Sequence, residues 1–478
     1  MKKFAFNPYL PQGEYVPDGE PHVFGDRVYV YGSHDQFGAN NFCVLDYVGY
    51  SAPVDDLSNW RYEGVIYRKT QDPDNADGSH VLFAPDVCQG PDGKFYLFYG
   101  LDFTKVIGVA RADSPAGPFE FYGKIRDKEG RLVGLREGDA MQYDPGVLVD
   151  DDGSVYLYSG FCTRKGPWLR MNLPVPPIQG AMVMKLEPDM LTIAHETKTV
   201  LPWSETAAGT SFEGHAFFEA SSMRKRGDTY YYIYSSENGH ELCYAKSDKP
   251  DGGFVYGGTI ISNGDIFPGE GGNKEPLNYT GTNHGSIEEI NGKWYVFYHR
   301  QTNKNYYTRQ GCAEEIAFDK DGNIPQVQIT SFGLNGGPLP ASETCPAYVA
   351  CNLMSGEGAL MLSFGMQVPD NHPFFTQESP SGEPVQYIAN MQGGAVAGFK
   401  YLSFTGSEQC LAITYRSADG ATLKVGTTLR GAQIGCVKLE PAEDWTETVA
   451  KVTAPEGAHA VYLTVSEGKA DLLKFRFQ

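Results

Sequence analysis

The feature that most constrains the fold of this chain is a short pattern that occurs five times in its first 330 residues. Each copy is a glycine-containing turn followed by a strand rich in aromatic and β-branched residues. Asp-Gly and Asn-Gly are strong hairpin signals, because a type I′ turn needs positive φ at both central residues. The pattern therefore predicts five β-hairpins. Their anchor residues are Tyr29, Tyr96, Tyr156, Tyr231 and Tyr295.

The spacing of these copies predicts the architecture. Successive anchor tyrosines lie 60 to 75 residues apart. That length holds about four short strands with their loops, which is one blade of a β-propeller. We therefore expect an all-β protein in which residues 1–335 form a five-bladed β-propeller.

The composition changes after a Gly/Pro-rich stretch at 333–340. Such a stretch is typical of a linker or a domain edge. Beyond it, segments such as 411–415 and 460–465 alternate apolar and polar residues. We expect residues 346–478 to form a β-sandwich of jelly-roll type. Because the linker is short and its prolines stiffen it, we expect the sandwich to pack against the propeller.

Charge and cysteine usage exclude several classes of protein. The chain has 39 basic and 59 acidic residues and a formal charge of −20, which argues against a nucleic-acid binder. No apolar run approaches the ~20 residues of a membrane-spanning helix. None of the 9 cysteines forms a Cys-x-x-Cys pair, which argues against zinc knuckles and thioredoxin-type chemistry. With no apolar stretch behind Lys2-Lys3, we expect a cytoplasmic protein.

Three acidic residues occupy similar positions in three of the expected blades. Asp18, Asp144 and Glu219 each precede the turn that leads into an aromatic strand. In a propeller, the strand before that turn lines the central channel, so the three carboxylates should converge at one end of the axis. Converging carboxylates are what acid–base hydrolysis of a glycosidic bond requires. Single carboxylates at such positions also cap turns or pair with arginine.

The set of motifs around these carboxylates resembles glycoside hydrolase family 43 over roughly residues 5–335. The resemblance implies that Asp18 is the general base, Glu219 the general acid, and Asp144 the residue that orients the acid and tunes its pKa. It also implies that His284 lies at the propeller centre, often near a calcium ion or a water cluster, and that Arg309 lines the pocket. The motifs are Pro17-Asp18 followed by His22-Val23-Phe24, Ser33-His34-Asp35, Phe83-Ala84-Pro85-Asp86, Tyr143-Asp144-Pro145, Glu219 before Tyr230, and His284-Gly285-Ser286.

Further residues are candidates for binding the substrate. His34, Asp35, Phe83 and Phe218 lie in or beside these motifs. Trp168 and Trp203 lie in long loops between strands and could serve as sugar platforms or as loop packing.

The sequence also departs from the family pattern. Gly19 follows Asp18 and Ala220 follows Glu219, where the family usually has proline and glycine respectively. Glu20 is therefore a rival for the base, and Glu213 is a rival for the acid. We prefer Asp18 and Glu219, because their distances to the following motifs fit the family pattern.

The resemblance implies an inverting, exo-acting glycosidase that acts on pentose-containing plant oligosaccharides. The expected activity is α-L-arabinofuranosidase or β-D-xylosidase; a β-D-galactofuranosidase and a non-catalytic sugar-binding propeller are alternatives. We expect an oligosaccharide as partner, no nucleic acid, no membrane and no organic cofactor, with a structural Ca²⁺ as an option at His284. The C-terminal part is similar to family 6 carbohydrate-binding modules, and a structural role for it is an equal alternative. The segments that carry this similarity are 398–404, 462–465 and 471–477.

Overall fold

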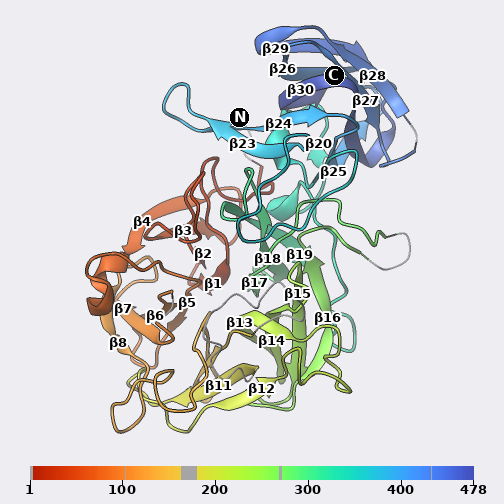
Figure 1. Cartoon of the computed structure of the whole chain (residues 1–478). Helices are drawn as coiled ribbons and strands as arrows, with labels where there is room; N and C mark the ends of the chain where they lie inside the picture. The colour runs from red at the N-terminus through yellow and green to blue at the C-terminus, as the bar shows by residue number, and fades with distance from the viewer. Residues whose placement is uncertain (1–3, 103, 163–179, 268–271, 432) are drawn as a thin grey trace.

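The computed structural model describes residues 4–102, 104–162, 180–267, 272–431 and 433–478. It contains strands and a few short 3-10 helices, and the chain folds into a ring of blades with a second β-module beside it (Figure 1). None of the helices in these ranges has the length and apolar character needed to span a bilayer. All nine cysteines are free, and seven of them are buried.

The predicted five-bladed propeller is confirmed. Blades I to IV are four-stranded antiparallel sheets, and blade V has three strands. The strands of blade I are β1 (Glu20–Phe24), β2 (Arg27–Tyr31), β3 (Tyr47–Pro53) and β4 (Arg61–Tyr67). Those of blade II are β5 (Asp86–Gln89), β6 (Phe95–Gly100), β7 (Ile107–Ala112) and β8 (Glu120–Lys124). Those of blade III are β9 (Gly146–Val149), β10 (Val155–Ser159), β11 (Ala181–Leu186) and β12 (Lys198–Leu201). Those of blade IV are β13 (Phe217–Arg226), β14 (Thr229–Ser236), β15 (Glu241–Ser247) and β16 (Val255–Ser262). Those of blade V are β17 (Ile287–Ile290), β18 (Lys293–Gln301) and β19 (Arg309–Ile316).

The five repeated turns all join the first strand of a blade to the second, but only one has both central residues at positive φ. Asn291 and Gly292 have φ values of 51° and 78°, as a type I′ turn requires. At the Asp-Gly turns of blades II and III only the glycines, Gly93 and Gly153, have positive φ, both 79°. A Cβ at Gly93 or Gly292 would have nothing within 4 Å. The backbone angle, and not a lack of space, therefore requires glycine at these turns.

The first strand of each blade lines the central axis. These inner strands contact one another from β1 to β13, and β17 contacts β1. The ring continues from blade IV to blade V through the hydroxyls of Ser222 and Ser286, which are 2.6 Å apart. Because neighbouring strands in a blade are antiparallel, the connections between blades and those between second and third strands share one end of the axis. The turns of the repeat lie at the other end.

The N-terminal segment completes blade V. The side-chain amide of Asn7 donates to the carbonyls of Ala313 and Thr330, both at 3.1 Å, and its oxygen accepts from Ala313 N at 2.9 Å. The backbone of Tyr9 also donates to Gly311 O at 3.3 Å. Residues near the start of the chain thus lie along β19 and join the two ends of the ring.

The strands after residue 338 form the second module, as predicted. Strand β30 is 22 residues long and joins its two faces. The first half of β30 pairs with β25 and β27, and the second half pairs with β24 and β26. The change occurs near Gly468, which has φ of 75° and lies so close to Gly420 that a Cβ would be 2.1 Å from its carbonyl oxygen. The module's strands are β20 (Leu339–Pro340), β21 (Cys345–Pro346), β22 (Asn352–Met354), β23 (Phe374–Glu378), β24 (Val385–Gln392), β25 (Val396–Thr405), β26 (Cys410–Ser417), β27 (Ala421–Gly426), β28 (Gln433–Leu439), β29 (Ala442–Lys451) and β30 (Glu456–Phe477).

Within the described ranges, four short 3-10 helices connect some of these strands. They are η1 (Lys69–Gln71), η2 (Pro73–Asn75), η4 (Gly333–Asn335) and η5 (Ala347–Val349).

The module packs against the propeller through a continuous apolar core. Phe42, Tyr279 and Tyr306 of the propeller pack in one cluster with Leu353 and Phe375 of the module. The contact therefore includes buried aromatic side chains from both partners.

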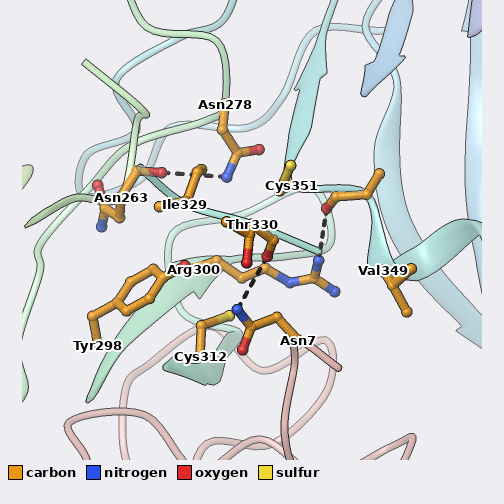
Figure 2. A pocket seen from close by; sticks show the side chains of 11 residues that line it. Asn7, Asn263, Asn278, Tyr298, Arg300, Cys312, Ile329, Thr330, Val349 and Cys351 are labelled. Carbon is orange, nitrogen blue, oxygen red and sulfur yellow. Dashed lines mark hydrogen bonds between the residues drawn. The ribbon is translucent and has the colours of Figure 1, made fainter. Parts of the chain in front are cut away.

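Polar contacts also cross this junction. The buried ion pair between Lys400 Nζ and Asp265 Oδ2 spans 2.6 Å. Arg300 donates to Ala350 O at 3.1 Å, beside a small pocket that also includes Asn7 and Asn263 (Figure 2). The domain boundary that the sequence places between residues 335 and 346 stays a prediction. The packing of the C-terminal module against the propeller is seen directly in these contacts.

Candidate active site

Four buried polar side chains from four blades meet at one end of the propeller axis. Asp18 precedes β1, Asp144 precedes β9, Glu219 lies near the start of β13, and His284 precedes β17. The Nδ1 atom of His284 is 3.6 Å from Asp144 Oδ2 and 4.0 Å from Asp18 Oδ1. The charge of Glu219 acts directly on the Asp144 carboxyl. The structure thus brings together the three carboxylates that the sequence placed at equivalent positions.

Arg309 connects two aspartates of blade I to blade V. Its Nη1 donates to Asp18 Oδ1 at 2.8 Å, and its Nε donates to Asp35 Oδ2 at 2.9 Å. Its Nη2 donates to the other oxygen of Asp35 at 3.1 Å. The ring of Phe42 covers the guanidinium, with the centroid 4.6 Å from Cζ. Asp35 is fully buried and fixes the arginine, which in turn fixes Asp18.

The environment of Asp18 favours its ionised form. Burial acts to raise the pKa of this carboxyl. The charge of Arg309, followed by the contact with His299, outweighs burial and holds the pKa well below its usual range. His299 is fully buried, with Nδ1 3.1 Å from Asp18 Oδ1 and Nε2 2.7 Å from Thr282 O. Asp18 is therefore a carboxylate at neutral pH.

The environment of Asp144 favours a bound proton. Burial, followed by the negative charges of Glu219 and Asp18, raises the pKa of the Asp144 carboxyl well above its usual value. Two neighbouring buried carboxyl groups are more stable when one of them is protonated than when both are ionised. Burial and the neighbouring negative charges thus favour a proton on Asp144, whereas Arg309 disfavours one on Asp18.

Burial keeps His284 neutral. Burial, partly offset by the Asp18 charge, lowers the pKa of this imidazole to about 4. At neutral pH its ring is uncharged and lies between Asp18 and Asp144.

The backbone at this site adopts a rare conformation in three blades. Asp18, Asp144 and Ala220 have φ values of 59°, 45° and 69°. Each such residue costs about 1–3 kcal/mol and tends to occur where function requires it. The amide of Ala220 donates to Asp144 Oδ2 at 3.3 Å, so Asp144 holds the segment that carries Glu219.

A row of aromatic rings lines the side of the site formed by blades II to IV. Neighbouring ring centroids lie 5.2 Å apart from Phe83 to Tyr143, 5.2 Å from Tyr143 to Phe161, and 5.5 Å from Phe161 to Phe218. The hydroxyl of Tyr47 donates to the carbonyl of Phe83 and fixes the start of the row. Phe83 and Phe218 both belong to this row, and their role in binding substrate stays a prediction.

Other candidates lie elsewhere. His34 Nδ1 is 2.8 Å from Asp46 O, and Nε2 is 4.0 Å from Glu14. These contacts place His34 in the loop of blade I and not between the carboxylates. Glu213 is exposed and accepts from Gly209 N in a local turn. Trp203 lies in the loop before β13, where its backbone accepts from Thr206; Trp168 lies outside the described residues.

Glu20 lies deeper in the axial channel than Asp18. It accepts from Ser222 Oγ and Arg224 Nη2, both at 3.1 Å. Burial and the charge of Asp86 raise the pKa of Glu20 to about 8. The rival for the base is therefore a largely neutral group near pH 7, bound to a different arginine.

Two groups of side chains among the described residues lie close enough together to hold a metal ion. In the axial channel Glu20, His22 and Asp86 lie close together. Asp86 already binds His22 Nε2 at 2.6 Å and Val147 N at 2.7 Å. Ca²⁺ takes six to eight oxygen ligands, which neither this group nor His284 with its two aspartates supplies. The protein side chains alone therefore do not fit a calcium cage.

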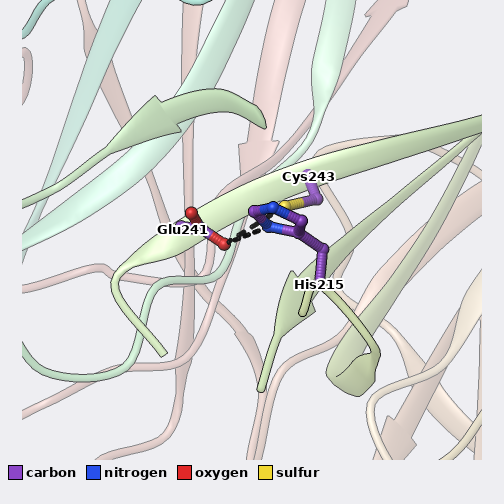
Figure 3. Close-up of side chains that lie close together, drawn as sticks. All are labelled: His215, Glu241 and Cys243. Atoms are coloured by element: carbon purple, nitrogen blue, oxygen red, sulfur yellow. Dashed lines mark hydrogen bonds and ion pairs between the residues drawn. The ribbon is translucent and has the colours of Figure 1, made fainter. Parts of the chain in front are cut away.

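The other group is His215, Glu241 and Cys243 in blade IV (Figure 3). Glu241 accepts from His215 at 2.9 Å, and also from Ser236 and Asn238. These hydrogen bonds account for the arrangement without a metal.

Sequence reasoning missed four residues of the site: Phe42, Tyr143, Phe161 and His299. Tyr143 is adjacent to Asp144, and this proximity was an available signal. His299 lies near the end of an aromatic strand, where the strand pattern gives no indication that its ring would reach the axis. Phe42 and Phe161 lie in loops, whose paths the sequence does not specify.

Known proteins match the chain along its length. The profile of glycosyl hydrolases family 43 matches residues 22–324. A xylosidase/arabinosidase of Thermoclostridium stercorarium is 49% identical over 483 residues, which is 99% of each chain.

Solved structures are also similar. A β-xylosidase/α-arabinofuranosidase from a compost microbial metagenome, solved with xylotriose in a calcium-free form, is 28% identical with a TM-score of 0.51. The similarity covers 68% of this chain and 98% of that one. An arabinoxylan arabinofuranohydrolase of Bacillus subtilis is 21% identical, covers 99% of this chain and 97% of its own, and has a TM-score of 0.51. At that identity the likeness concerns the fold.

Proposed function

Because the chain belongs to glycoside hydrolase family 43 and is therefore a glycosidase, we propose that it removes terminal pentose units from plant oligosaccharides with inversion of configuration. The observation that carries the proposal is the meeting of three buried carboxylates at one end of the axis, where Arg309 lowers the pKa of Asp18 while burial and the Glu219 charge raise that of Asp144. An inverting glycosidase needs one carboxylate as base and one carboxylic acid as proton donor. The name of the Thermoclostridium relative supports xylosides and arabinosides as substrates.

In this proposal Asp18 activates the water that attacks the anomeric carbon. Arg309, with Asp35 behind it, keeps the acceptor oxygens of Asp18 oriented and ionised. The Nδ1 atom of His299 lies 3.1 Å from the same carboxylate, on the β18 side. The base thus accepts a proton from water in the transition state and is regenerated when the product leaves.

Glu219 donates a proton to the departing glycosidic oxygen. The negative charge of Asp144 keeps the proton on Glu219 until the leaving oxygen develops enough negative charge to accept it. Asp144 also fixes the backbone after Glu219 through Ala220 N. These steps are proton transfers and need no organic cofactor. His284 is neutral and lies beside both Asp18 and Asp144, where it orients them without adding a charge.

A substrate panel tests the proposal. The 4-nitrophenyl glycosides of α-L-arabinofuranose, β-D-xylopyranose and β-D-galactofuranose are incubated with the purified protein, and 4-nitrophenol release is measured. We expect hydrolysis of one or both pentosides. Activity confined to the galactofuranoside would contradict the pentose assignment, and no release from any substrate would support a sugar-binding propeller.

A second prediction concerns the acid. Glu219→Gln should lower kcat on an unactivated oligosaccharide by about 10²- to 10⁴-fold, because its alkoxide leaving group needs the proton. The loss should be much smaller on a 4-nitrophenyl glycoside, whose leaving group is a weaker base. Glu213→Gln is the matched control and should leave both rates unchanged. Equal losses on both substrates would contradict the role of Glu219.

A third prediction separates the two candidates for the base. Asp18→Asn should lower kcat by about 10²- to 10⁴-fold on both activated and unactivated substrates, because each needs an activated water. Glu20→Gln should be mild near pH 7, because the raised pKa of about 8 already keeps this carboxyl mostly protonated and glutamine resembles that form. Steady-state kinetics of the two variants gives the ranking. The reverse ranking would assign the base to Glu20.

A further inference from the structure

A loop of the C-terminal module reaches the end of the propeller that carries the carboxylates. The loop lies between β22 and β23 and pairs with two propeller connections. Leu362 N donates to Thr280 O at 2.7 Å, and Val368 N donates to Lys304 O at 2.7 Å. Thr280 precedes β17, as His284 does, and Lys304 lies between β18 and β19. Both connections belong to the end of the axis where Asp18 lies.

Phe364 lies at the exposed part of this loop. Its ring centroid is 5.8 Å from that of Phe42, 5.5 Å from Tyr306 and 6.2 Å from Tyr307. Phe42 and Tyr306 are buried, yet Phe364 is 61% exposed. The protein thus holds a large apolar ring in place on one side and leaves its other surface to the solvent.

A short chain of contacts joins Phe364 to the proposed base. Phe364 contacts Phe42, Phe42 covers the guanidinium of Arg309 at 4.6 Å, and Arg309 binds Asp18 at 2.8 Å. The row of rings from Phe83 to Phe218 lies on blades II to IV, whereas Phe364 lies beside blades V and I. The exposed ring is therefore on the rim of the site, one layer outside the buried groups.

The exposure of Phe364 is unusual for this protein. Six large apolar side chains are exposed among the described residues; Phe364 is the most exposed of them, and Met361 of the same loop, at 49%, is another of the six. Exposed apolar surface gathered next to a catalytic site commonly marks a ligand-binding groove. The C–H faces of a sugar ring are the apolar surfaces that an aromatic ring at this place can cover.

We propose that Phe364 is a binding residue for the sugar unit on the leaving-group side of the scissile bond, so that the C-terminal module contributes directly to the substrate site. The inference rests on the proposed function, because it places the terminal pentose among the buried carboxylates. The next unit of the oligosaccharide then lies at the rim, against Phe364. Its recognition is apolar stacking and involves no proton transfer.

The experiment compares Phe364→Ala with Val449→Ala in the full-length protein. Val449 is 51% exposed on β29 of the same module and is a matched loss of exposed apolar surface. The substrate is whichever of xylotriose or arabinose-substituted xylotriose the unchanged protein hydrolyses. Phe364→Ala should lower kcat/KM on it by about three- to tenfold, the size of an aromatic stacking contribution. The inhibition constant of the free pentose should stay within about twofold, and Val449→Ala should match the unchanged protein in both readings.

Two further measurements keep the test decisive. Phe364→Tyr retains the ring and should restore kcat/KM, which a general loss of folding would not allow. Calorimetric binding of xylotriose to Asp18→Asn, with and without Phe364→Ala, measures the contact without turnover. The unchanged protein could hydrolyse no pentoside while Phe364→Ala still lowers the affinity for the oligosaccharide. The proposed function would then be wrong, but the binding role of Phe364 would be supported. The inference would be overturned if Phe364→Ala changed neither the oligosaccharide affinity nor kcat/KM. It would also be overturned if Phe364→Ala weakened inhibition by the free pentose as much as it lowered kcat/KM.

Discussion

The buried contact between Arg309, Asp18 and Asp35 is the interaction on which the site depends. Arg309 is the first residue of β19 in blade V, and the two aspartates belong to blade I. A guanidinium out of water is tolerated when its donors match carboxylate oxygens in a fixed geometry, as they do here. The contact joins the last blade to the first and holds Asp18 ionised. Ring closure and activation of the proposed base therefore rely on the same three side chains.

The repeat made the propeller predictable because its signals are local. A glycine at positive φ and an aromatic strand depend on neighbours in the sequence, so five blades could be counted from five turns. The completion of blade V by Asn7 was not predictable, since it depends on residues more than 300 positions apart. The type of each turn was only partly predictable: of the turns predicted as type I′, only Asn291-Gly292 has both residues at positive φ.

The sequence indicated which carboxylates form the site better than it indicated which of them are ionised and which are protonated. Three carboxylates at equivalent blade positions indicated convergence at the axis, and the structure brings them together. Asp18 and Glu20 are two positions apart, Asp18 just before β1 and Glu20 at its first residue, yet their environments differ. Their contrast arises from Arg309 on one side and Asp86 on the other. These partners come from other blades, as does the ring of His299. The sequence could not show that Asp18 and Asp144 would adopt positive φ.

The loop between β22 and β23 gives the C-terminal module a proposed role in substrate binding in addition to its packing against the propeller. Its similarity to family 6 carbohydrate-binding modules stays a prediction, whereas its contacts with the propeller are extensive and partly buried. A module fixed in this way presents Phe364 at a constant position beside the site. The proposed substrate site thus has a buried polar floor from the propeller and an apolar rim to which the module contributes.

The configuration of the first product tests the central claim most directly. Proton NMR recorded during the first minutes of hydrolysis of an oligosaccharide shows the anomeric signal of the released pentose before mutarotation. If Asp18 activates water while Glu219 protonates the leaving oxygen, the first product has the opposite anomeric configuration to the substrate. A first product with the substrate's own configuration would mean that a carboxylate attacks the sugar as a nucleophile, and would contradict this account.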